Sequence, residues 1–345
     1  MSTDPSADQE KYTHCHALDC HRTQQKSLFV DLTTPEVALD VARSARASFG
    51  ADDLALARSS WTDAAGALST AVQRLRHVGL DDFGGLDSDP ELAMVACLVA
   101  EEAGRAALPA PVAALITGAG TGRSVPLHAV DRGVDQVLLD YAALLDQSCT
   151  IDPSGHIVPM MATPLTADPK MLAPHAAVCR PVGDGEVGSP RTWAWHETFS
   201  AFSSSGAMSH VLDLGARHLN ERIQFGKPLK TRQALEYRFV DAAVAARGLR
   251  ELALFTAWRL NADPTAGEGA ALALRLVHLE TVRDVMRHIH QIHGAIGFCF
   301  EHDLALISQY LQFRRYQPVP LSQTRARLAD HIDDIPSLHR AGSLG

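Results

Sequence analysis

The sequence predicts a mainly helical protein with a small β-domain in its middle. Long segments on either side of the middle repeat apolar residues at helical spacing, whereas short apolar runs separated by turn residues fill about residues 123–190. The chain has 345 residues, enough for two or three domains of ordinary size. We expect a disordered tail at residues 1–34, a helical domain at 35–120, a reduced β-domain at 121–190 and a four-helix bundle at 191–345.

Composition is typical of a soluble globular enzyme, with 46% hydrophobic and 21% charged residues. The net charge of −9 argues against a general nucleic-acid binder, because binding phosphates needs clustered Lys and Arg. No apolar run is long enough to cross a bilayer, and the first thirty residues lack the apolar core of a signal peptide. Cys97, Cys149, Cys179 and Cys299 have apolar neighbours, which predicts buried free thiols. We therefore expect a cytoplasmic protein whose partners include neither nucleic acid nor a membrane.

One short cluster in the tail contains metal-ligating residue types. It has no second ligand pair at zinc-finger spacing and lies in a polar segment without periodicity. We therefore predict no metal site and interpret the cluster as part of a disordered tail. Its members are His14, Cys15, His16, Cys20 and His21.

The first domain has clear helix boundaries. A helical pattern begins at Thr34-Pro35, where proline suits the first turn. An apolar helix is expected at about residues 90–107, and Pro109 and Pro111 end it. We expect this domain to finish in a flexible glycine-rich stretch at residues 118–122.

Short strands are expected in the middle region. Residues 137–139 and 176–178 are short apolar runs of the strand type. Residues 151–158 predict a hairpin, with Pro153 at the first central position of its turn. Asp184-Gly185 predicts another tight turn.

The C-terminal region predicts long helices. Apolar residues in segment 232–261 step alternately by four and three, which indicates one stripe packed against another helix. Asp263-Pro264 predicts the N-cap and first-turn proline of the next helix. With one helix before Arg222 and one after Glu301, four helices result, and a bundle is the economical arrangement.

Two motifs at predicted helix ends combine residue types that suit a ligand. In the first, Arg222 offers a rigid fork for phosphate, and Phe225 offers a flat ring for stacking. In the second, Gln291 precedes a small-residue turn at which backbone can approach a ligand closely. Each motif alone also has a structural explanation, since Arg suits a helix C-terminus, Phe suits a core and His-Gly-Ala suits a C-cap.

Taken together, the motifs resemble those of the acyl-CoA dehydrogenases. The similarity covers about residues 40–317, strongly at both ends and weakly in the middle. The matching stretches are Phe83-Gly84-Gly85, Ala100-Glu101-Glu102-Ala103-Gly104-Arg105-Ala106 with Pro109, Arg222-Ile223-Gln224-Phe225-Gly226-Lys227-Pro228 with Gln233, and Gln291-Ile292-His293-Gly294-Ala295-Ile296-Gly297-Phe298 with Glu301-His302-Asp303-Leu304.

The resemblance implies that FAD lies across a subunit boundary. In that family, these motifs grip the pyrophosphate and adenosine of a cofactor whose flavin ring lies on the neighbouring subunit. Ala295 replaces the usual second glycine and adds a methyl group near the ligand. The residues that inherit cofactor binding by position are Arg222, Gln224, Phe225, Gln291, Gly294 and Ala295.

Two functional elements of the family have no clear counterpart. The middle region lacks the "TEP…GSD"-like segment that binds the flavin ring and acyl-CoA. One usual place for the catalytic glutamate falls in residues 317–320, which offer no carboxylate. At the other place, this chain has His196 with Glu197 beside it, one position from the expected base, and one residue turns a helical side chain by about 100°. Glu197 and His196 are the catalytic candidates; alternatively, they are a polar pair in the first turn of a helix.

These losses are similar to those in the abbreviated subunit of α2β2 actinobacterial acyl-CoA dehydrogenases. The resemblance implies α,β-dehydrogenation of an acyl-CoA thioester, with a steroid side chain or a fatty acyl group. The implied partners are a longer homologous subunit or a second copy of this chain, and an electron-transfer acceptor protein. Two alternatives stay open: an FAD-independent hydratase or dehydratase that uses His196 and Glu197, and a non-catalytic structural subunit.

Overall fold

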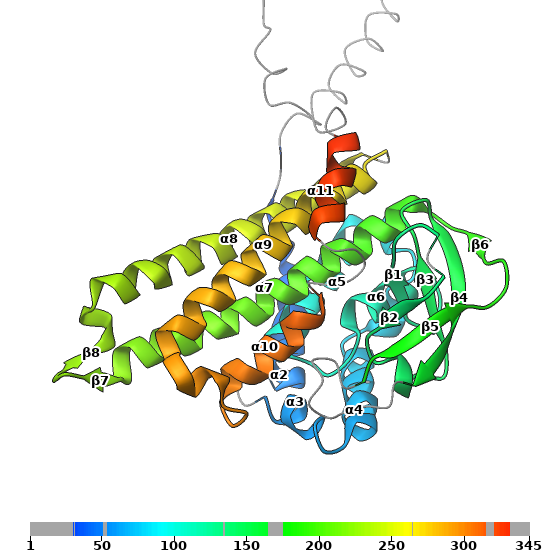
Figure 1. The fold of residues 1–345 in the computed structure, drawn as a ribbon. Helices are drawn as coiled ribbons and strands as arrows, with labels where there is room; N and C mark the ends of the chain where they lie inside the picture. The colour runs from blue at the N-terminus through cyan, green and yellow to red at the C-terminus, as the bar shows by residue number, and fades with distance from the viewer. Residues whose placement is uncertain are drawn as a thin grey trace, which may run out of the picture. The chain divides into compact units, whose positions relative to one another are not determined.

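The computed structural model describes residue 30 and residues 32–50, 54–133, 135–164, 175–263, 265–314 and 321–331. Residues 34–345 cluster as one unit. Its order is helices, a small sheet and a second group of helices (Figure 1), as predicted. The His and Cys residues of the predicted tail lie outside the described residues.

The first group of helices forms where the sequence places caps. Asp89 accepts hydrogen bonds from the backbone N–H groups of Glu91 and Leu92, and Pro90 occupies the first turn, so the predicted apolar helix begins there. The expectation of a flexible stretch at 118–122 is wrong at its start, because Gly118 is helical and buried. The helices are α2 (Glu36–Phe49), α3 (Ala55–Ser59), α4 (Ala64–His77), α5 (Pro90–Arg105) and α6 (Val112–Gly120), with 3-10 turns η3 (Leu80–Asp82) and η4 (Leu86–Ser88).

A small mixed sheet follows in the order β1-β3-β4-β5-β2, with β6 paired to β4. The predicted hairpin is confirmed: Ile151 pairs with Ile157, and the N–H of Gly155 donates to Asp152 O across a turn that contains Pro153. Apolar residues on one side of the sheet form its core, among them Leu139. The strands are β1 (Leu127–Ala129), β2 (Val137–Leu139), β3 (Ser148–Ile151), β4 (His156–Pro164), β5 (Ala177–Pro181) and β6 (Glu186–Val187), with the 3-10 turn η5 (Ala142–Leu144) between β2 and β3.

Four helices of the C-terminal region pack as the predicted bundle (Figure 1). The heptad stripe of segment 232–261 is buried from Ala242 to Leu260. The expectation that Asp263 caps the next helix is wrong, because its carboxylate accepts hydrogen bonds from Thr265 and the helix begins at Glu268. The helices are α7 (Pro190–Glu221), α8 (Gln233–Ala262), α9 (Glu268–His293) and α10 (Asp303–Arg314).

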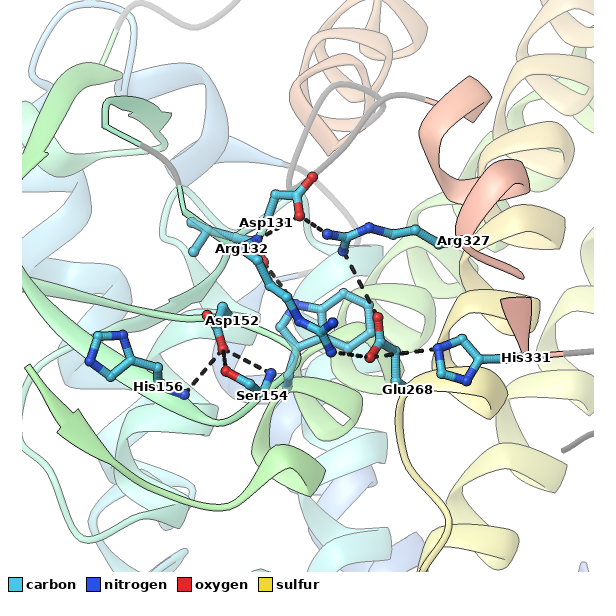
Figure 2. A network of polar contacts seen from close by, with 10 residues as sticks. Asp131, Arg132, Asp152, Ser154, His156, Glu268, Arg327 and His331 are labelled. Atoms are coloured by element: carbon cyan, nitrogen blue, oxygen red, sulfur yellow. Dashed lines mark hydrogen bonds and ion pairs between the residues drawn. The ribbon is translucent and has the colours of Figure 1, made fainter. Parts of the chain in front are cut away.

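A further helix, α11 (Leu321–Asp330), is tied to the start of α9 by a polar network. Figure 2 shows Glu268 between Arg132 and Arg327, with Asp131 on the far side of Arg327. The Arg132 guanidinium donates to Glu268 at 2.7 Å. The network joins α11, α9 and the loop after β1, which are distant in the sequence.

The cysteine prediction is partly confirmed. Cys97 and Cys179 are buried and Cys149 is half-buried, all as free thiols. Cys299 is exposed, because it follows the turn at the end of α9 rather than lying inside a helix face. No helix among the described residues has the length and apolar character that a membrane span requires.

Helix α7 is the central helix, packed against α5, α6, α8 and α9. Two glycines let it approach α5 at backbone distance. A Cβ added to Gly104 would lie 1.7 Å from Ser203 O, and one added to Gly206 would lie 1.8 Å from Glu101 O. Any larger residue at either position would push the two helices apart.

A buried ion pair holds α7 to α9. Arg275 Nη1 donates to Glu197 Oε2 at 3.0 Å, and both side chains are 1% exposed. Burial alone would raise the pKa of Glu197, but Arg275, helped by His196, outweighs burial and lowers that pKa to about 2. Glu197 is therefore a carboxylate at neutral pH and a weak base.

The helix crossing gives a first prediction. Gly206→Ala should destabilise the protein by about 1–3 kcal/mol or more, because the added methyl group overpacks the α5–α7 contact. Gly248→Ala is the matched control: it also lies inside a helix, but an added Cβ would meet no atom within 4 Å. The control should be neutral or stabilising by up to about 1 kcal/mol. Urea unfolding of the two variants measures both, and equal stability would contradict the packing argument.

The buried pair gives a second prediction. Glu197→Ala should lower the free energy of unfolding by about 3–5 kcal/mol, because Arg275 is left charged and buried, whereas replacing both residues by Leu should restore most of the loss. Since the pKa of Glu197 is depressed, its stabilisation is complete above its ordinary pKa of about 4.3 and is lost as pH falls toward about 2. The free energy of unfolding, measured across this pH range, checks that the stabilisation falls as the pH falls. Equal acid sensitivity of the wild type and the double Leu variant would contradict it.

Candidate functional site

A cavity of about 750 Å³ lies where α7 and α9 end. Its volume falls in the range of roughly 300–1,000 Å³ that is usual for small-molecule sites. Five of the six residues predicted to bind the cofactor line it, and all five are exposed. These five are Arg222, Gln224, Gln291, Gly294 and Ala295; the other lining residues are His218, Glu221, Leu229, Leu235, Ile292, His293 and Ile296.

A tight hairpin positions the first motif. Strands β7 (Ile223–Gln224) and β8 (Lys227–Pro228) pair through a two-residue turn, and the 3-10 turn η6 (Leu229–Thr231) follows. Both turn residues, Phe225 and Gly226, have positive φ angles, 53° and 76°, as a type I′ turn requires. Phenylalanine rarely adopts this conformation, and such strain is concentrated at functional sites.

Phe225 is the one predicted cofactor residue that does not line the cavity. Its side chain is 85% exposed, and the Arg232 guanidinium lies 5.5 Å from the centre of its ring. The ring therefore lies beside the cavity, available to a molecule that covers this end of the bundle.

A single glycine shapes the second motif. Helix α9 ends at His293, and Gly294 follows with φ 65° and ψ −145°, a conformation that favours glycine. An added Cβ on Gly294 would meet no atom within 4 Å, so the space beside this backbone is open. The 3-10 turn η7 (Gly294–Phe298) then presents Ala295 to the cavity.

Stacked imidazoles form part of the cavity wall, which the sequence motifs did not predict. The rings of His218 and His293 stack with centres 4.5 Å apart, and His302 meets His293 edge-on at 5.0 Å. Burial lowers the pKa of all three, that of His293 to about 4, so the stack is uncharged at neutral pH. His293 donates its Nδ1 proton to Ile289 O, which fixes its tautomer. Of these three histidines, His293 lies inside the second sequence motif, and this position could have marked it as a site residue.

The catalytic candidates lie at the opposite end of α7. At 1.5 Å per residue, the helix from His196 to its end at Glu221 spans about 37 Å. Within one chain, the cavity at the helix ends and the His196–Glu197 pair therefore cannot contact the same reacting atoms.

His196 and Glu197 line a second, smaller cavity of about 60 Å³ beneath α6 and β1. An adjoining cavity of about 60 Å³ shares Asp140 and Phe313 with it. We call the two together the inner cleft. Apolar side chains make up most of the wall near His196: Pro111, Ala113, Ala114, Ala129, Leu138, Leu139 and Phe313.

His128 also lines the inner cleft and was not among the predicted site residues. Its side chain is 7% exposed, and its Nε2 is buried without a hydrogen-bond partner. Burial, with His196 nearby, lowers the pKa of His128 to about 3, so this imidazole is neutral. As a lone histidine in a short strand, it gave no sequence signal.

No group of three or more His, Cys, Asp or Glu side chains in the described part of the chain has the arrangement to hold a metal ion. The described residues offer a site for a ligand at the helix ends, through Arg222 and exposed backbone, and titratable side chains in the inner cleft.

Comparison with known proteins agrees with these motifs. Residues 197–319 match the family model described as acyl-CoA dehydrogenase, C-terminal domain. The acyl-CoA dehydrogenase IpdE2 of Mycolicibacterium smegmatis is 29% identical over 242 residues, which are 66% of this chain and 74% of that protein.

Solved structures share the fold at low sequence identity. A Tcur3481–Tcur3483 steroid ACAD variant has a TM-score of 0.69 at 18% identity, covering 88% of this chain and 99% of that one. The ChsE4–ChsE5 complex from Mycobacterium tuberculosis has a TM-score of 0.67 at 16% identity, covering 89% of this chain and 100% of that one. Residues 197–319 of this chain therefore match the C-terminal domain of the acyl-CoA dehydrogenases, and the chain has the fold of that family.

Proposed function

We propose that this chain is a subunit of an FAD-dependent acyl-CoA dehydrogenase and supplies the adenosine and pyrophosphate side of a shared FAD site. The open cavity at the helix ends carries the proposal, because it gathers five residues of the two family motifs. The cofactor, when bound, supplies a hydride acceptor for α,β-dehydrogenation of an acyl-CoA thioester. The substrate is an acyl-CoA, with a fatty acyl group or a steroid side chain.

The chemistry of the cavity suits the two parts of such a ligand differently. Helices α7 and α9 both end here, so their exposed carbonyl groups give the site a partial negative charge, and Glu221 adds to it. A neutral base and sugar fit beside the uncharged His218 and His293 rings. Pyrophosphate is anionic and needs a fixed cation, and Arg222 is the arginine that lines the cavity.

The surface around the cavity supports a site shared between subunits. Large apolar side chains are exposed there, Phe225 at 85% and Phe298 at 69%, as is typical of a surface that a partner covers. The long distance along α7 between this cavity and the inner cleft also favours a flavin ring held by another chain.

The proposed partner is a longer homologous subunit in an α2β2 assembly, with a second copy of this chain as the alternative. The solved ChsE4–ChsE5 complex contains two different proteins, and this chain shares its fold. An electron-transfer acceptor protein would reoxidise the flavin, as the family reaction requires.

Glu197 is a weaker proposal for the catalytic base than His196. Its Oε2 is bonded to Arg275, and its low pKa reduces its basicity. His196 is half-buried, and its ring lines the inner cleft. Two alternatives remain: an FAD-independent hydratase or dehydratase that uses His196 and Glu197, and a purely structural subunit. The cofactor test below separates both from the proposal.

Flavin retention tests the role of Arg222. Arg222→Ala should weaken FAD binding by the assembled enzyme about 10- to 100-fold, because a charge-assisted hydrogen bond contributes about 1.5–3 kcal/mol. Equilibrium dialysis with flavin fluorescence gives the dissociation constant. Arg43→Ala is the matched control, an exposed arginine on α2 that does not line the cavity. Unchanged FAD binding in Arg222→Ala would favour the structural-subunit alternative.

Assembly tests the shared site. We expect the chain purified alone to hold little FAD, and the chain co-expressed with a longer acyl-CoA dehydrogenase homologue from its own organism to co-purify with it as a yellow complex. Size-exclusion chromatography with absorbance at protein and flavin wavelengths measures both. A yellow homomer with acyl-CoA dehydrogenase activity would overturn the heteromeric arrangement.

A further inference from the structure

We propose that α11 is a strap that holds the inner cleft closed: its ion pairs fasten α11 to the loop after β1 and to the start of α9, and their release lets the cleft widen. The use of the open cleft for an acyl group rests on the proposed function, whereas the strap rests on contacts inside this chain. Four residues carry it: Phe313, Arg327, Asp131 and Glu268.

The inner cleft is small for a ligand site. Each of its two cavities holds about 60 Å³, whereas small-molecule sites usually measure roughly 300–1,000 Å³. A ligand of that ordinary size enters only if part of the wall moves. The structure therefore shows the cleft in a closed state.

One part of the wall can shift at small cost. Around His196, the elements α6, α7 and β1 contribute mostly buried residues, and moving them would disturb the packed core. Phe313 lines both cavities, is half-buried and lies one residue before α10 ends. Displacing the end of α10 would join the two cavities and widen the cleft.

Helix α11 begins seven residues after α10 ends, and it buries little apolar surface. It packs on α9. Within α11, Thr324 is buried, and Leu321 and Leu328 are half-buried. Hydrophobic stabilisation is proportional to the apolar area removed from water, so polar contacts supply a large share of what holds α11 in place. An element with few buried apolar contacts opens at a low cost in free energy.

Arg327 is the centre of the fastening (Figure 2). Its guanidinium forms an ion pair with Asp131 in the loop after β1, and its Nη1 lies 4.0 Å from Glu268 Oε1 at the start of α9. His331 Nε2, just beyond α11, lies 3.7 Å from Glu268 Oε2. The side chains of Arg327 and Asp131 are both 21% exposed, so water and salt screen this pair less than they screen a pair on the open surface.

The loop after β1 is a fixed anchor for the strap. The Val130 N–H donates to Ile151 O at 2.9 Å, and the Val130 carbonyl accepts from Trp193 Nε1 at 3.1 Å. Trp193 is itself fully buried on α7. When Arg327 lets go, the loop stays with the sheet and α7, and the parts that move are α11 and the end of α10.

Hydrogen–deuterium exchange of the full-length protein, followed by mass spectrometry, tests the strap. We expect Arg327→Ala to speed amide exchange in α11 and in the last turn of α10 about tenfold, the size expected for losing one charge-assisted hydrogen bond. Arg325→Ala is the matched control: Arg325 also lies on α11, but it is 57% exposed and pairs with Glu280 of α9 rather than with the loop. In this control, exchange in α10 should match the wild type.

Modification of His128 by diethyl pyrocarbonate reports opening of the cleft itself. His128 lines the cleft and is 7% exposed, so its reaction requires opening. We expect the reaction to be about tenfold faster in Arg327→Ala, in proportion to the increase in opening. Asp131→Asn should act like Arg327→Ala, and the double variant should add little, because both substitutions remove the same pair.

Three outcomes would overturn the strap. These are an unchanged rate at His128 in Arg327→Ala, an equal effect of Arg325→Ala, and faster exchange that extends into the buried helix α5, which would report a general loss of stability. None of these readouts uses flavin or acyl-CoA. Failure of the proposed function would show instead as an absence of flavin in the assembled enzyme, so the two failures are distinguishable.

Discussion

The close packing of α7 against its neighbours is the constraint on which the rest of the structure depends. Gly104 and Gly206 bring α5 and α7 to backbone contact, and the Glu197–Arg275 pair holds α7 to α9 in the interior. A helix fixed on both sides holds its two ends at a set separation. The positions of the cavity at the helix ends and of the inner cleft therefore follow from how this one helix is held.

That separation keeps two different environments apart in one chain. The far end of α7 is open, exposed and suited to a large ligand, whereas the inner cleft is small, apolar and lined by neutral or internally paired groups. Burial lowers the pKa of His128 and of the His218–His293 stack, so the protein keeps imidazoles uncharged in both places. Arg222 is the arginine that lines the cavity at the helix ends, and it is the residue there whose fixed positive charge suits an anionic group.

Much of the fold could be predicted because local signals agreed with tertiary packing. The heptad stripe of α8, the cap at Asp89 and the turn at Pro153 each specify a local structure that the fold keeps. The incorrect predictions lie where tertiary packing, rather than the local sequence, determines the backbone structure. Gly118 lies inside a helix and its bare backbone packs against Val125 O, and Asp263 turns the chain before the helix that it was expected to cap.

The candidate site was predictable only where a motif is contiguous. Arg222 and Gln291 are nearly seventy residues apart, yet each belongs to a recognisable stretch, and the structure brings both to one cavity. His128 belongs to no recognisable stretch, and its place in the inner cleft depends on neighbours from α6 and α7 that only the fold supplies. The same holds for Glu197: its sequence position suggested a base, whereas the buried Arg275 beside it holds it as an ion-paired carboxylate. Sequence position can mark a residue as a candidate base, but the charge of its buried neighbour determines whether it can act as one.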